Sequence, residues 1–410
     1  MIPPDVPTIP FDAVLFDLDG TLVATERFWP DAARAGALQA FGELGLDREP
    51  PTRSEWMSLV GRPLDEGFDE LFPDLEEPVR RQVQARCVEM EHELLADGRA
   101  AVLPGVVETL ETLHAAGVRM GIASNCSQGY LDAMMGGLGL DRWIDEARCL
   151  HSPGIRDKAG MVEDLLFTFD TRRAVMVGDR GGDRDAAWEN GIPHVHLARG
   201  YALAGEEVSA EATIEGMDAL LRALGLRARM ISEAATALAL APGAVVGVSG
   251  TRASGKTLFA DELAGVLSRS GTPSRVVALE GFRTGRSRGP EDPFAGAFDL
   301  QRLSTEVLDP HEQARATGEA EVLILEGPHL VHPALAVSLD RLIWLDGPEE
   351  VRLRRLAGRD ARVVGPVPVM EARAEDMPLE QALVAAHPPS GPRTLRLDQG
   401  NLLVPAPARA

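Results

Sequence analysis

Short apolar runs alternate with helical patterns in two separate parts of the chain. The runs, each ending in turn-forming residues, occupy residues 13–20, 117–124, 172–179 and 194–198 in the first part, and 244–250, 274–281, 320–327 and 340–347 in the second. Apolar runs of this length, separated by helices, are typical of strands buried inside parallel sheets. The pattern predicts an α/β fold with two doubly wound parallel sheets, one in each part.

The domain organisation follows from what lies between these runs. The stretch over residues 25–100 is mostly helical and acidic, and further helical patterns cover residues 215–224 and 225–242. The last of these is rich in Ala but not in Gly or Ser, which predicts a connecting helix and not a flexible linker. We therefore expect a first domain over residues 1–224 and a second domain over residues 243–410.

The composition is that of a globular protein with more than one domain. The chain has 410 residues, of which 45% are hydrophobic and 25% charged, whereas one domain has ~150 residues. No stretch approaches the ~18 consecutive apolar residues of a membrane helix, and the N-terminus lacks the pattern of a signal peptide. Three widely spaced cysteines predict neither a disulfide framework nor a zinc site. We expect a cytoplasmic protein with no membrane partner.

The charge is unevenly distributed along the chain. The formal net charge is -22, and residues 1–224 hold 40 acidic and 20 basic side chains. An acidic surface repels a phosphodiester backbone, which argues against a nucleic-acid partner. Only two of the 41 basic residues are lysines, Lys158 and Lys256. Lysine is a compact point charge where arginine is a planar fork, so these two positions are candidate sites.

Two carboxylates follow the first apolar run, in the segment Asp17-Leu18-Asp19-Gly20-Thr21. Open α/β sheets bind ligands at the carboxyl ends of their strands, which is where this segment lies. Asp17 has the chemistry to attack a phosphorus atom and form an aspartyl-phosphate. Asp19 has the chemistry to protonate the leaving oxygen and then to deprotonate water. An all-oxygen site of this kind suits Mg²⁺.

Later strand ends supply the remaining groups that such a site needs. Ser124 and Asn125 end the second run, where a hydroxyl and backbone N–H groups can hold phosphate oxygens. Lys158 can pair with Asp17 and with the charge of the transferred phosphoryl group. Asp179 and Asp183 follow the third run and add carboxylates for a metal ion.

His194 and His196 form a further pair near these groups. Two histidines in alternate positions can hold a metal ion. Their positions lie within a predicted strand, however, and simple alternation along that strand explains the spacing better.

This set of motifs resembles the haloacid dehalogenase-like phosphatases over residues 11–224. The matching features are DLDGT, the position of Ser124, Lys158, and GDxxxD over residues 179–183. The resemblance implies that Asp17 is the nucleophile and Asp19 the acid and base. It further implies that Mg²⁺ is held by Asp17, the backbone carbonyl of Asp19 and Asp179. The second aspartate favours a phosphatase or phosphomutase over a dehalogenase.

The helical stretch over residues 25–100 corresponds to a cap domain in this resemblance. Its segment GRPLDEGF over residues 61–68 is similar to the phosphoglycolate phosphatase-like and β-phosphoglucomutase-like branch, which makes Arg62 a substrate-binding candidate. One departure is Ala159 after Lys158, where that branch often has proline. A small phosphorylated metabolite is the substrate that the resemblance implies.

A second motif opens the second part of the chain. Residues 250–257, GTRASGKT, fit the phosphate-binding pattern G-x-x-x-x-G-K-[ST] between an apolar run and an amphipathic helix. Backbone N–H groups in such a loop close around a phosphate, and the helix N-terminus adds positive potential. ATP is therefore the predicted ligand. Lys256 would reach its terminal phosphates, Thr257 would ligate Mg²⁺, and the loop residues Gly250, Ser254 and Gly255 would contact the phosphates.

This loop resembles those of uridine kinase-like and phosphoribulokinase-like enzymes, with the resemblance extending over about residues 243–362. It places Asp299 in the pocket of a small hydroxyl acceptor and Glu326 near the metal ion. Arg355 and Arg359 are candidates for contacting ATP in an arginine-rich lid. The family usually has an Asp as the base, whereas this chain has Glu280 at that position.

Together the motifs predict a bifunctional enzyme, with a Mg²⁺-dependent phosphatase followed by an ATP-dependent kinase for a small hydroxyl metabolite such as a nucleoside or sugar. Two alternatives remain open. A phosphatase fused ahead of a P-loop kinase is also the order of animal polynucleotide kinase-phosphatases, although the acidic charge and the cap argue against nucleic-acid ends. The second part can also be a module that binds ATP without transferring phosphate and regulates the phosphatase.

Overall fold

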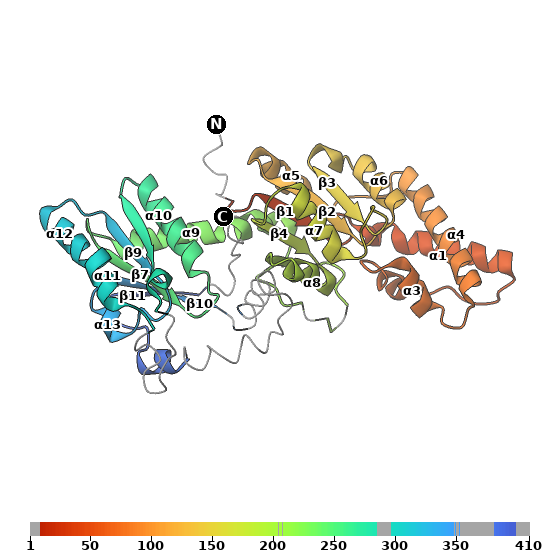
Figure 1. The fold of residues 1–410 in the computed structure, drawn as a ribbon. Coiled ribbons are helices and arrows are strands. Elements are labelled where there is room, and N and C mark those ends of the chain that lie inside the picture. The colour runs from red at the N-terminus through yellow and green to blue at the C-terminus, as the bar shows by residue number, and fades with distance from the viewer. Residues whose placement is uncertain are drawn as a thin grey trace. The chain divides into compact units, whose positions relative to one another are not determined.

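The structure is a computed structural model that describes residues 9–203, 205–206, 208–284, 297–347, 349, 352 and 381–398. The chain divides into two compact units between Gly225 and Leu226. Each unit contains its own sheet, and Figure 1 labels the elements of both. Because each unit forms a separate body, the two are described one after the other.

The first unit is built on a six-stranded parallel sheet with the order β3-β2-β1-β4-β5-β6. The strands are β1 (Ala13–Phe16), β2 (Arg119–Ser124), β3 (Glu146–Cys149), β4 (Ala174–Gly178), β5 (His194–Leu197) and β6 (Ala212–Ile214). All residues of β1 and β4 are buried, which explains their continuous apolar sequence. Strand β1 pairs with β2 on one side and β4 on the other, so its carboxyl end lies where the strand order reverses. Open α/β sheets bind ligands at such a point.

Helices of the first unit cover its sheet and form its cap. Outside the cap they are α5 (Val106–Ala115), α6 (Gln128–Gly137), α7 (Lys158–Thr168) and α8 (Gly181–Glu189), with short 3-10 helices at Leu140–Arg142 and Met217–Ala219. Helices α7 and α8 pack against Leu15 and Met176 on one face of the sheet. Burial of these apolar faces holds the strand ends, and the residues that follow them, in fixed positions.

The cap lies between β1 and α5 in the sequence. Its elements are a 3-10 helix at Thr25–Arg27 and the helices α1 (Trp29–Leu44), α2 (Arg53–Met57), α3 (Leu64–Leu71) and α4 (Glu77–Ala96). Trp56 is fully buried, and its ring lies within 6.3 Å of the rings of Trp29, Phe68 and Phe72. This aromatic cluster gives the cap its own core. The helical prediction for residues 25–100 is consistent with these elements.

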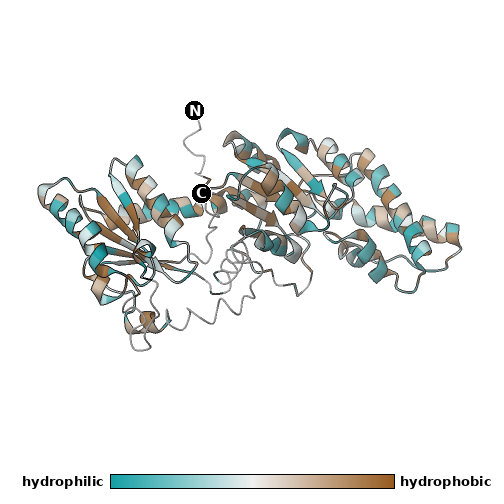
Figure 2. Ribbon diagram, in the orientation of Figure 1, coloured by the Kyte–Doolittle hydropathy of each residue, from teal (hydrophilic) through white to brown (hydrophobic). Residues whose placement is uncertain are grey.

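The second unit is built on a five-stranded parallel sheet with the order β11-β10-β7-β9-β8. The strands are β7 (Val245–Gly250), β8 (Ser274–Ala278), β9 (Val322–Glu326), β10 (Arg341–Asp346) and β11 (Thr394–Asp398). The helical elements are α10 (Lys256–Arg269), α11 (Leu300–Leu303), a π-helical turn at Ser304–Leu308, α12 (Asp309–Thr317), α13 (Pro333–Ala336) and a 3-10 helix at Leu279–Phe282. Figure 2 shows mainly hydrophobic strands in both sheets. Strand β7 lies between β9 and β10, so the loop after it also begins where the strand order reverses.

Helix α9 differs from the predicted pattern. The sequence predicts separate helices over 215–224 and 225–242, whereas α9 runs without a break over Leu220–Leu238. Its later residues Ile231, Ala234 and Leu238 pack in the core of the second unit, so this segment is more than a connector. Glycine costs ~1 kcal/mol inside a helix, but burial of apolar residues on both sides of Gly225 outweighs that cost.

None of the helices that the structure describes combines the length and the apolar character needed to cross a bilayer.

Candidate active site

The first candidate site begins where β1 ends. Asp17 is 1% exposed and Asp19 is 8% exposed, and a tight turn at Gly20 follows them. Gly20 has φ of 79°, and a Cβ there would lie 2.5 Å from Oδ2 of Asp179. Glycine is therefore required at this position for the turn and for the close approach of the β4 carboxylate.

Lys158 joins the ends of two strands through its ammonium group. Its Nζ donates hydrogen bonds to Oδ1 of Asp17 at 2.6 Å and to Oδ1 of Asp183 at 2.5 Å. The lysine stands at the first turn of α7, where the side chain of Asp157 caps the helix by accepting from the Gly160 N–H. Burial opposes the charge on Lys158, but the two carboxylates outweigh it and raise the pKa of the lysine. Lys158 is therefore a fixed cation at the centre of the site.

Three buried carboxylates surround this lysine. Oxygens of Asp17, Asp179 and Asp183 lie within 4.8 Å of one another. Burial raises the pKa of Asp17 well above its usual range, although Lys158 acts in the opposite direction. Burial and the charge of Asp183 raise the pKa of Asp179 to about 7. Such a cluster carries more negative charge than one lysine can balance.

The donor set fits a divalent cation such as Mg²⁺. Oδ2 of Asp17 and Oδ1 of Asp179 are buried and have no hydrogen-bond partner in the structure. Unpaired buried carboxylate oxygens are costly, and a hard cation bound by oxygen ligands would remove that cost. Both oxygens of Asp183 are already occupied, one by Lys158 and the other by the backbone N–H of Arg180 at 2.9 Å. Oδ2 of Asp17 and Oδ1 of Asp179 are thus the oxygens of this cluster without a hydrogen bond.

Asp19 is held by two hydroxyl groups instead of by the lysine. Oγ1 of Thr25 donates to its Oδ1 at 2.6 Å, and the hydroxyl of Tyr130 donates to the same oxygen at 2.5 Å. Burial raises the pKa of Asp19, and the two hydrogen bonds lower it without cancelling the effect of burial. A carboxyl group with a raised pKa is suited to give and take a proton near neutral pH.

Comparison with known proteins places this arrangement in a family. A family model described as haloacid dehalogenase-like hydrolase matches residues 14–197. Two relatives named phosphoglycolate phosphatase, from Caulobacter vibrioides and Haemophilus influenzae, are 30% identical to the chain over 198 and 200 residues. The matches cover 46% and 47% of this chain, and 79% and 87% of those proteins. The chain belongs to the haloacid dehalogenase-like hydrolases.

Two further proteins are similar to this chain at lower identity. A probable phosphatase from Dickeya dadantii is 26% identical over 203 residues, which is 48% of this chain and 86% of that protein. A predicted phosphoglycolate phosphatase from Haemophilus somnus has a solved structure with 21% identity and a TM-score of 0.47, covering 52% of this chain and 98% of its own. The first unit is a phosphatase of the haloacid dehalogenase-like family, whose phosphatases use Mg²⁺. The prediction of that family for the first part is confirmed.

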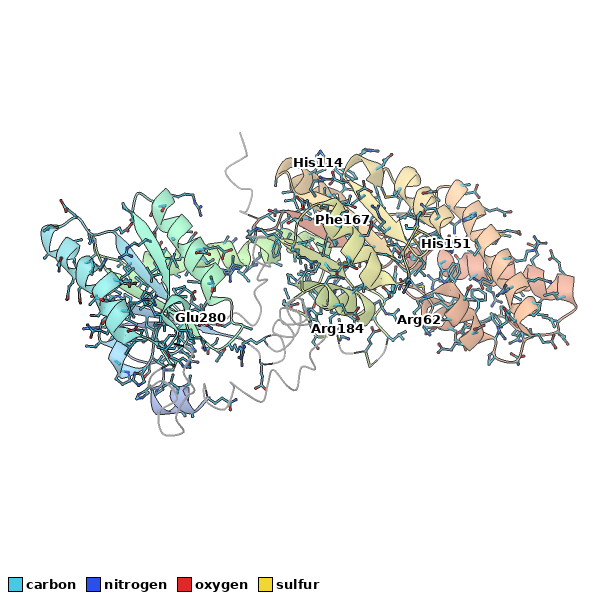
Figure 3. The ribbon with its side chains drawn as sticks, in the orientation of Figure 1. Arg62, His114, His151, Phe167, Arg184 and Glu280 are labelled. Atoms are coloured by element: carbon cyan, nitrogen blue, oxygen red, sulfur yellow. The ribbon has the colours of Figure 1, made fainter. Side chains whose placement is uncertain are left out.

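Other predicted residues of this phosphatase lie where the cap meets the core. Ser124 is buried at the end of β2. The side-chain amide of Asn125 donates to the backbone carbonyl of Gly61 at 3.2 Å, so it holds the cap loop. Arg62, which Figure 3 labels, pairs with Glu70 at 2.7 Å. Both Asn125 and Arg62 thus have partners within the protein.

The histidine pair does not form part of the carboxylate cluster. His194 and His196 lie on β5 with ring centroids 6.2 Å apart. Burial lowers the pKa of His194 to about 3, so this side chain is neutral. Among the described residues, the only group of three or more candidate ligands is Asp17, Asp179 and Asp183.

Several contacts of the site were not predicted from the sequence. Thr25 and Tyr130 reach Asp19, the backbone N–H of Tyr201 donates to Asp179, and the Tyr201 hydroxyl donates to Glu26. Arg180 donates to the backbone carbonyl of Val60 at 2.6 Å and pairs with Glu206 at 3.1 Å. Arg180 occupies a variable position of GDxxxD. The other residues lie outside the motifs, although Thr25 stands close to one in the sequence.

The second candidate site is the loop between β7 and α10. Ala253 and Gly255 have φ of 59° and 81°, and a Cβ on Gly250 would lie 2.4 Å from the carbonyl oxygen of Leu345. Turn conformations of this kind are found in loops whose backbone N–H groups bind an anion. Nζ of Lys256 donates to the carbonyls of Gly250 at 3.2 Å and Thr251 at 2.9 Å.

Other predicted residues of the second unit divide into two groups. Oγ1 of Thr257 donates to Oε1 of Glu326 at 3.1 Å, and Glu326 is 5% exposed. By contrast, Glu280, labelled in Figure 3, is exposed and pairs with Arg283 at 2.5 Å. Asp299 is also exposed, and its side chain caps α11 by accepting from the Arg302 N–H. The structure thus joins Thr257 and Glu326 but ties Glu280 and Asp299 to local partners.

Ser254 is buried within the loop, at 1% exposed. Arg355 and Arg359 lie outside the described residues. The neighbouring Arg352 donates from Nη1 to the backbone carbonyl of Arg252 at 3.2 Å. A basic side chain that follows β10 therefore contacts the loop.

Proposed function

We propose that the first unit hydrolyses small phosphomonoesters through a phosphorylated Asp17. In the first step Oδ2 of Asp17 attacks the phosphorus atom, the bond from phosphorus to the leaving oxygen breaks, and Asp19 gives that oxygen a proton. In the second step Asp19 takes a proton from water, the water oxygen bonds to phosphorus, and the bond to Asp17 breaks. The products are an alcohol and inorganic phosphate, and both aspartates return to their starting states.

The contact that carries this proposal is the double hydrogen bond of Lys158. It fixes Oδ1 of Asp17 and leaves Oδ2 without a partner, as an attacking oxygen requires. Lys158 would also balance the charge of the phosphoryl group. Ser124 would hold a phosphoryl oxygen from the end of β2.

We assign the metal ligands to Asp17, Asp179 and the backbone carbonyl of Asp19, with Asp183 orienting Lys158 beside them. When bound there, Mg²⁺ would supply electrophilic stabilisation of the phosphoryl oxygens. The unpaired Oδ1 of Asp179 supports this assignment, and Asp17 would contribute Oδ1, which accepts from Lys158 and has a second lone pair.

The cap contacts support a substrate of small size. Asn125 and Arg180 hold the cap loop by its backbone at Gly61 and Val60. A loop held by these two contacts restricts access to the site and would obstruct a nucleic-acid end more than a small phosphorylated metabolite. Relatives named phosphoglycolate phosphatase also support a small substrate.

The test compares full-length protein with Asp17→Asn, using phosphate release from a panel of phosphorylated metabolites in the presence of Mg²⁺. The substitution should lower the rate by ~10³-fold or more, because it removes the attacking carboxylate. Asp31→Asn, at an exposed position in the cap, is the matched control and should retain the full rate. An Asp17→Asn protein that keeps its activity would exclude this mechanism.

For the second unit, we propose ATP-dependent phosphorylation of a small hydroxyl metabolite. Lys256 and the loop N–H groups would bind the phosphates, and the contact of Thr257 with Glu326 supports a metal site there. Glu280 would act as the base. Asp299 would contact the acceptor, and Arg355 and Arg359 would contact ATP.

A second candidate is an ATP-binding module that transfers no phosphate and regulates the phosphatase. The exposure of Glu280 and its pairing with Arg283 favour this candidate. The two are distinguished by incubating the full-length protein with ATP and a broad panel of nucleosides and sugars. Phosphorylated acceptor that is lost in Lys256→Ala supports a kinase, and ATP binding without any product supports a module. Salt-sensitive binding to DNA or RNA ends would instead favour nucleic-acid end repair.

A further inference from the structure

The cap contains a buried carboxylate that the proposed mechanism does not use. Glu91 lies in helix α4 and is 5% exposed. Its carboxylate makes no hydrogen bond or ion pair with any residue that the structure describes. An isolated buried carboxyl group is costly, so its presence indicates a partner that the described part of the chain does not supply.

The position of Glu91 on its helix directs it to the first turn of α1. The buried residues of α4 are Val83, Cys87 and Glu91, which are spaced by four residues and share one face. Cys87 packs on α1, where its thiol donates to the carbonyl of Ala33 at 3.3 Å. Further along, Arg99 lies 3.9 Å from Asp31 near the start of α1. The two helices are therefore antiparallel, and Glu91 lies between these contacts.

Helix α6 contacts both α4, near Glu91, and the proposed catalytic acid Asp19. A Cβ on Gly129 would lie 3.7 Å from Cε1 of His92, so the first turn of α6 lies against α4 next to Glu91. Tyr130, the next residue of α6, donates to Asp19 at 2.5 Å. In agreement, the pKa of Glu91 is raised well above its usual range by burial and by the charge of Asp19. Glu91 therefore lies on the same side of the site as Asp19.

We propose that Glu91 binds the alcohol part of the substrate through a hydrogen-bond donor, either a hydroxyl or an ammonium group, and selects against substrates whose leaving group carries a carboxylate. This inference rests on the proposed function, in which Asp19 protonates the leaving oxygen. The alcohol part then lies beside Asp19 and hence beside Glu91. Burial already raises the pKa of both Asp19 and Glu91, so negative charge is disfavoured at this place of low dielectric constant, and a substrate carboxylate would add such a charge there.

The basic groups of the site offer little to an anionic leaving group. Each already pairs with a carboxylate of the protein: Lys158 with Asp17 and Asp183, Arg180 with Glu206, and Arg62 with Glu70. A substrate carboxylate would have to compete with these pairs. We therefore expect this chain to differ in specificity from its relatives named phosphoglycolate phosphatase, whose substrate carries a carboxylate.

The experiment measures kcat/KM of the full-length protein for three phosphomonoesters that differ in the leaving group. Glycerol 3-phosphate offers hydroxyls, phosphoethanolamine an ammonium group, and phosphoglycolate a carboxylate. The unaltered protein should prefer one of the first two over phosphoglycolate. Glu91→Gln should reduce this preference by ~10-fold or more, because glutamine keeps the shape but cannot ionise to pair with an ammonium group, and its amide N–H can donate to a substrate carboxylate. The exposed Glu93→Gln on the same helix is the control and should leave the preference unchanged.

A preference for phosphoglycolate, or a ratio that Glu91→Gln does not alter, would overturn the inference. The proposed function has a separate readout, the Asp17-dependent hydrolysis of acetyl phosphate, whose leaving group has no donor for Glu91. If no ester is turned over, calorimetry replaces the kinetic measurement. It gives the affinities for glycerol 3-phosphate and for phosphoglycolate, first of the Asp17→Asn protein and then of the protein that carries both Asp17→Asn and Glu91→Gln. If the ratio of the two affinities is the same in both proteins, the inference about Glu91 is likewise overturned.

Discussion

The two candidate sites of this chain hold negative charge in opposite ways. In the first unit, side chains from the ends of β1 and β4 and from the start of α7 meet in a buried cluster around Lys158. In the second unit, one continuous segment between β7 and α10 is proposed to bind phosphate through its backbone N–H groups, and Nζ of Lys256 donates to two carbonyls of that segment. The first site joins charged side chains that are far apart in the sequence, whereas the second consists of one short segment of the chain.

This difference has consequences for stability and for specificity. A buried charge cluster depends on every partner, since loss of one leaves the others uncompensated. A backbone cradle depends instead on glycine conformation and on the helix that follows. Substitutions in the first site should therefore affect folding and activity together, whereas those in the second should affect ligand binding alone.

The largest effect is expected from Lys158→Ala. The substitution leaves Asp17 and Asp183 buried without their cation, which should cost ~3 kcal/mol or more of the free energy of unfolding. Phosphatase activity should fall by ~10³-fold, since the nucleophile also loses its orientation. Urea unfolding and phosphate release measure the two effects. Lys256→Ala is the control. An equally large loss of stability in that variant would contradict the proposed difference between the two sites.

A second effect concerns magnesium and pH. The pKa of Asp179 is about 7, raised by burial and by Asp183. A folded-state pKa above the unfolded value of 3.8 means that the stability contribution of Asp179 is present below about pH 4 and is lost as pH rises to about 7. Mg²⁺ offsets the charge that then appears, so it should raise Tm by several degrees more at about pH 8 than at about pH 5.

The variant Asp179→Asn should abolish most of this pH dependence, since the group no longer titrates. Its cation-free Tm at about pH 8 should exceed that of the unaltered protein. An identical response to Mg²⁺ at both pH values, measured by thermal unfolding of the full-length protein, would argue against a cation at the carboxylate cluster.

A smaller effect is expected from Gly250→Ala. The added Cβ would lie 2.4 Å from the carbonyl oxygen of Leu345 and would displace the loop. ATP affinity, measured by calorimetry, should fall by ~10-fold or more, with phosphatase activity unchanged. Gly265→Ala in α10 is the control, because its Cβ would meet only the flexible side chain of Arg269 at 3.4 Å. Unaltered ATP affinity in Gly250→Ala would contradict a role for the loop conformation.

The smallest effect is expected from Tyr130→Phe. It removes one hydrogen bond to Asp19, worth ~1 kcal/mol, so kcat should fall about 5-fold. That hydrogen bond lowers the pKa of Asp19, so its loss should move the limb of the pH–rate profile that reports Asp19 to higher pH. The kcat profile over pH gives both quantities. An unshifted profile would show that Tyr130 acts only in packing.

Sequence patterns predicted much of this fold because a strand that is buried on both faces has a continuous apolar sequence. Strands β1 and β4 are buried along their whole length and read as continuous apolar runs. Strand β3, with the sequence EARC, is mostly half-buried and polar, and no apolar run marked it. Strand β11 lies at the edge of its sheet within a segment rich in Pro and Arg. Edge strands carry a weaker hydrophobic signal than central ones, which is why both were missed.

The candidate site was predictable where strand ends carry the chemistry. Asp17, Lys158 and Asp183 converge because the carboxyl ends of parallel strands share one edge. Thr25, Tyr130 and Glu91 were not predicted, since their proximity to Asp19 arises from packing between the cap and the core. Such contacts join residues far apart in the sequence and leave no periodic pattern.

The most direct test of the central claim is to identify the residue that carries phosphate during turnover. Full-length protein is acid-quenched while it hydrolyses a phosphomonoester with Mg²⁺, treated with borohydride, and analysed by mass spectrometry of its peptides. Borohydride reduces an aspartyl-phosphate to homoserine, and we expect this product to form at Asp17 alone. Homoserine at another aspartate, or none at Asp17 under conditions of active turnover, would contradict it.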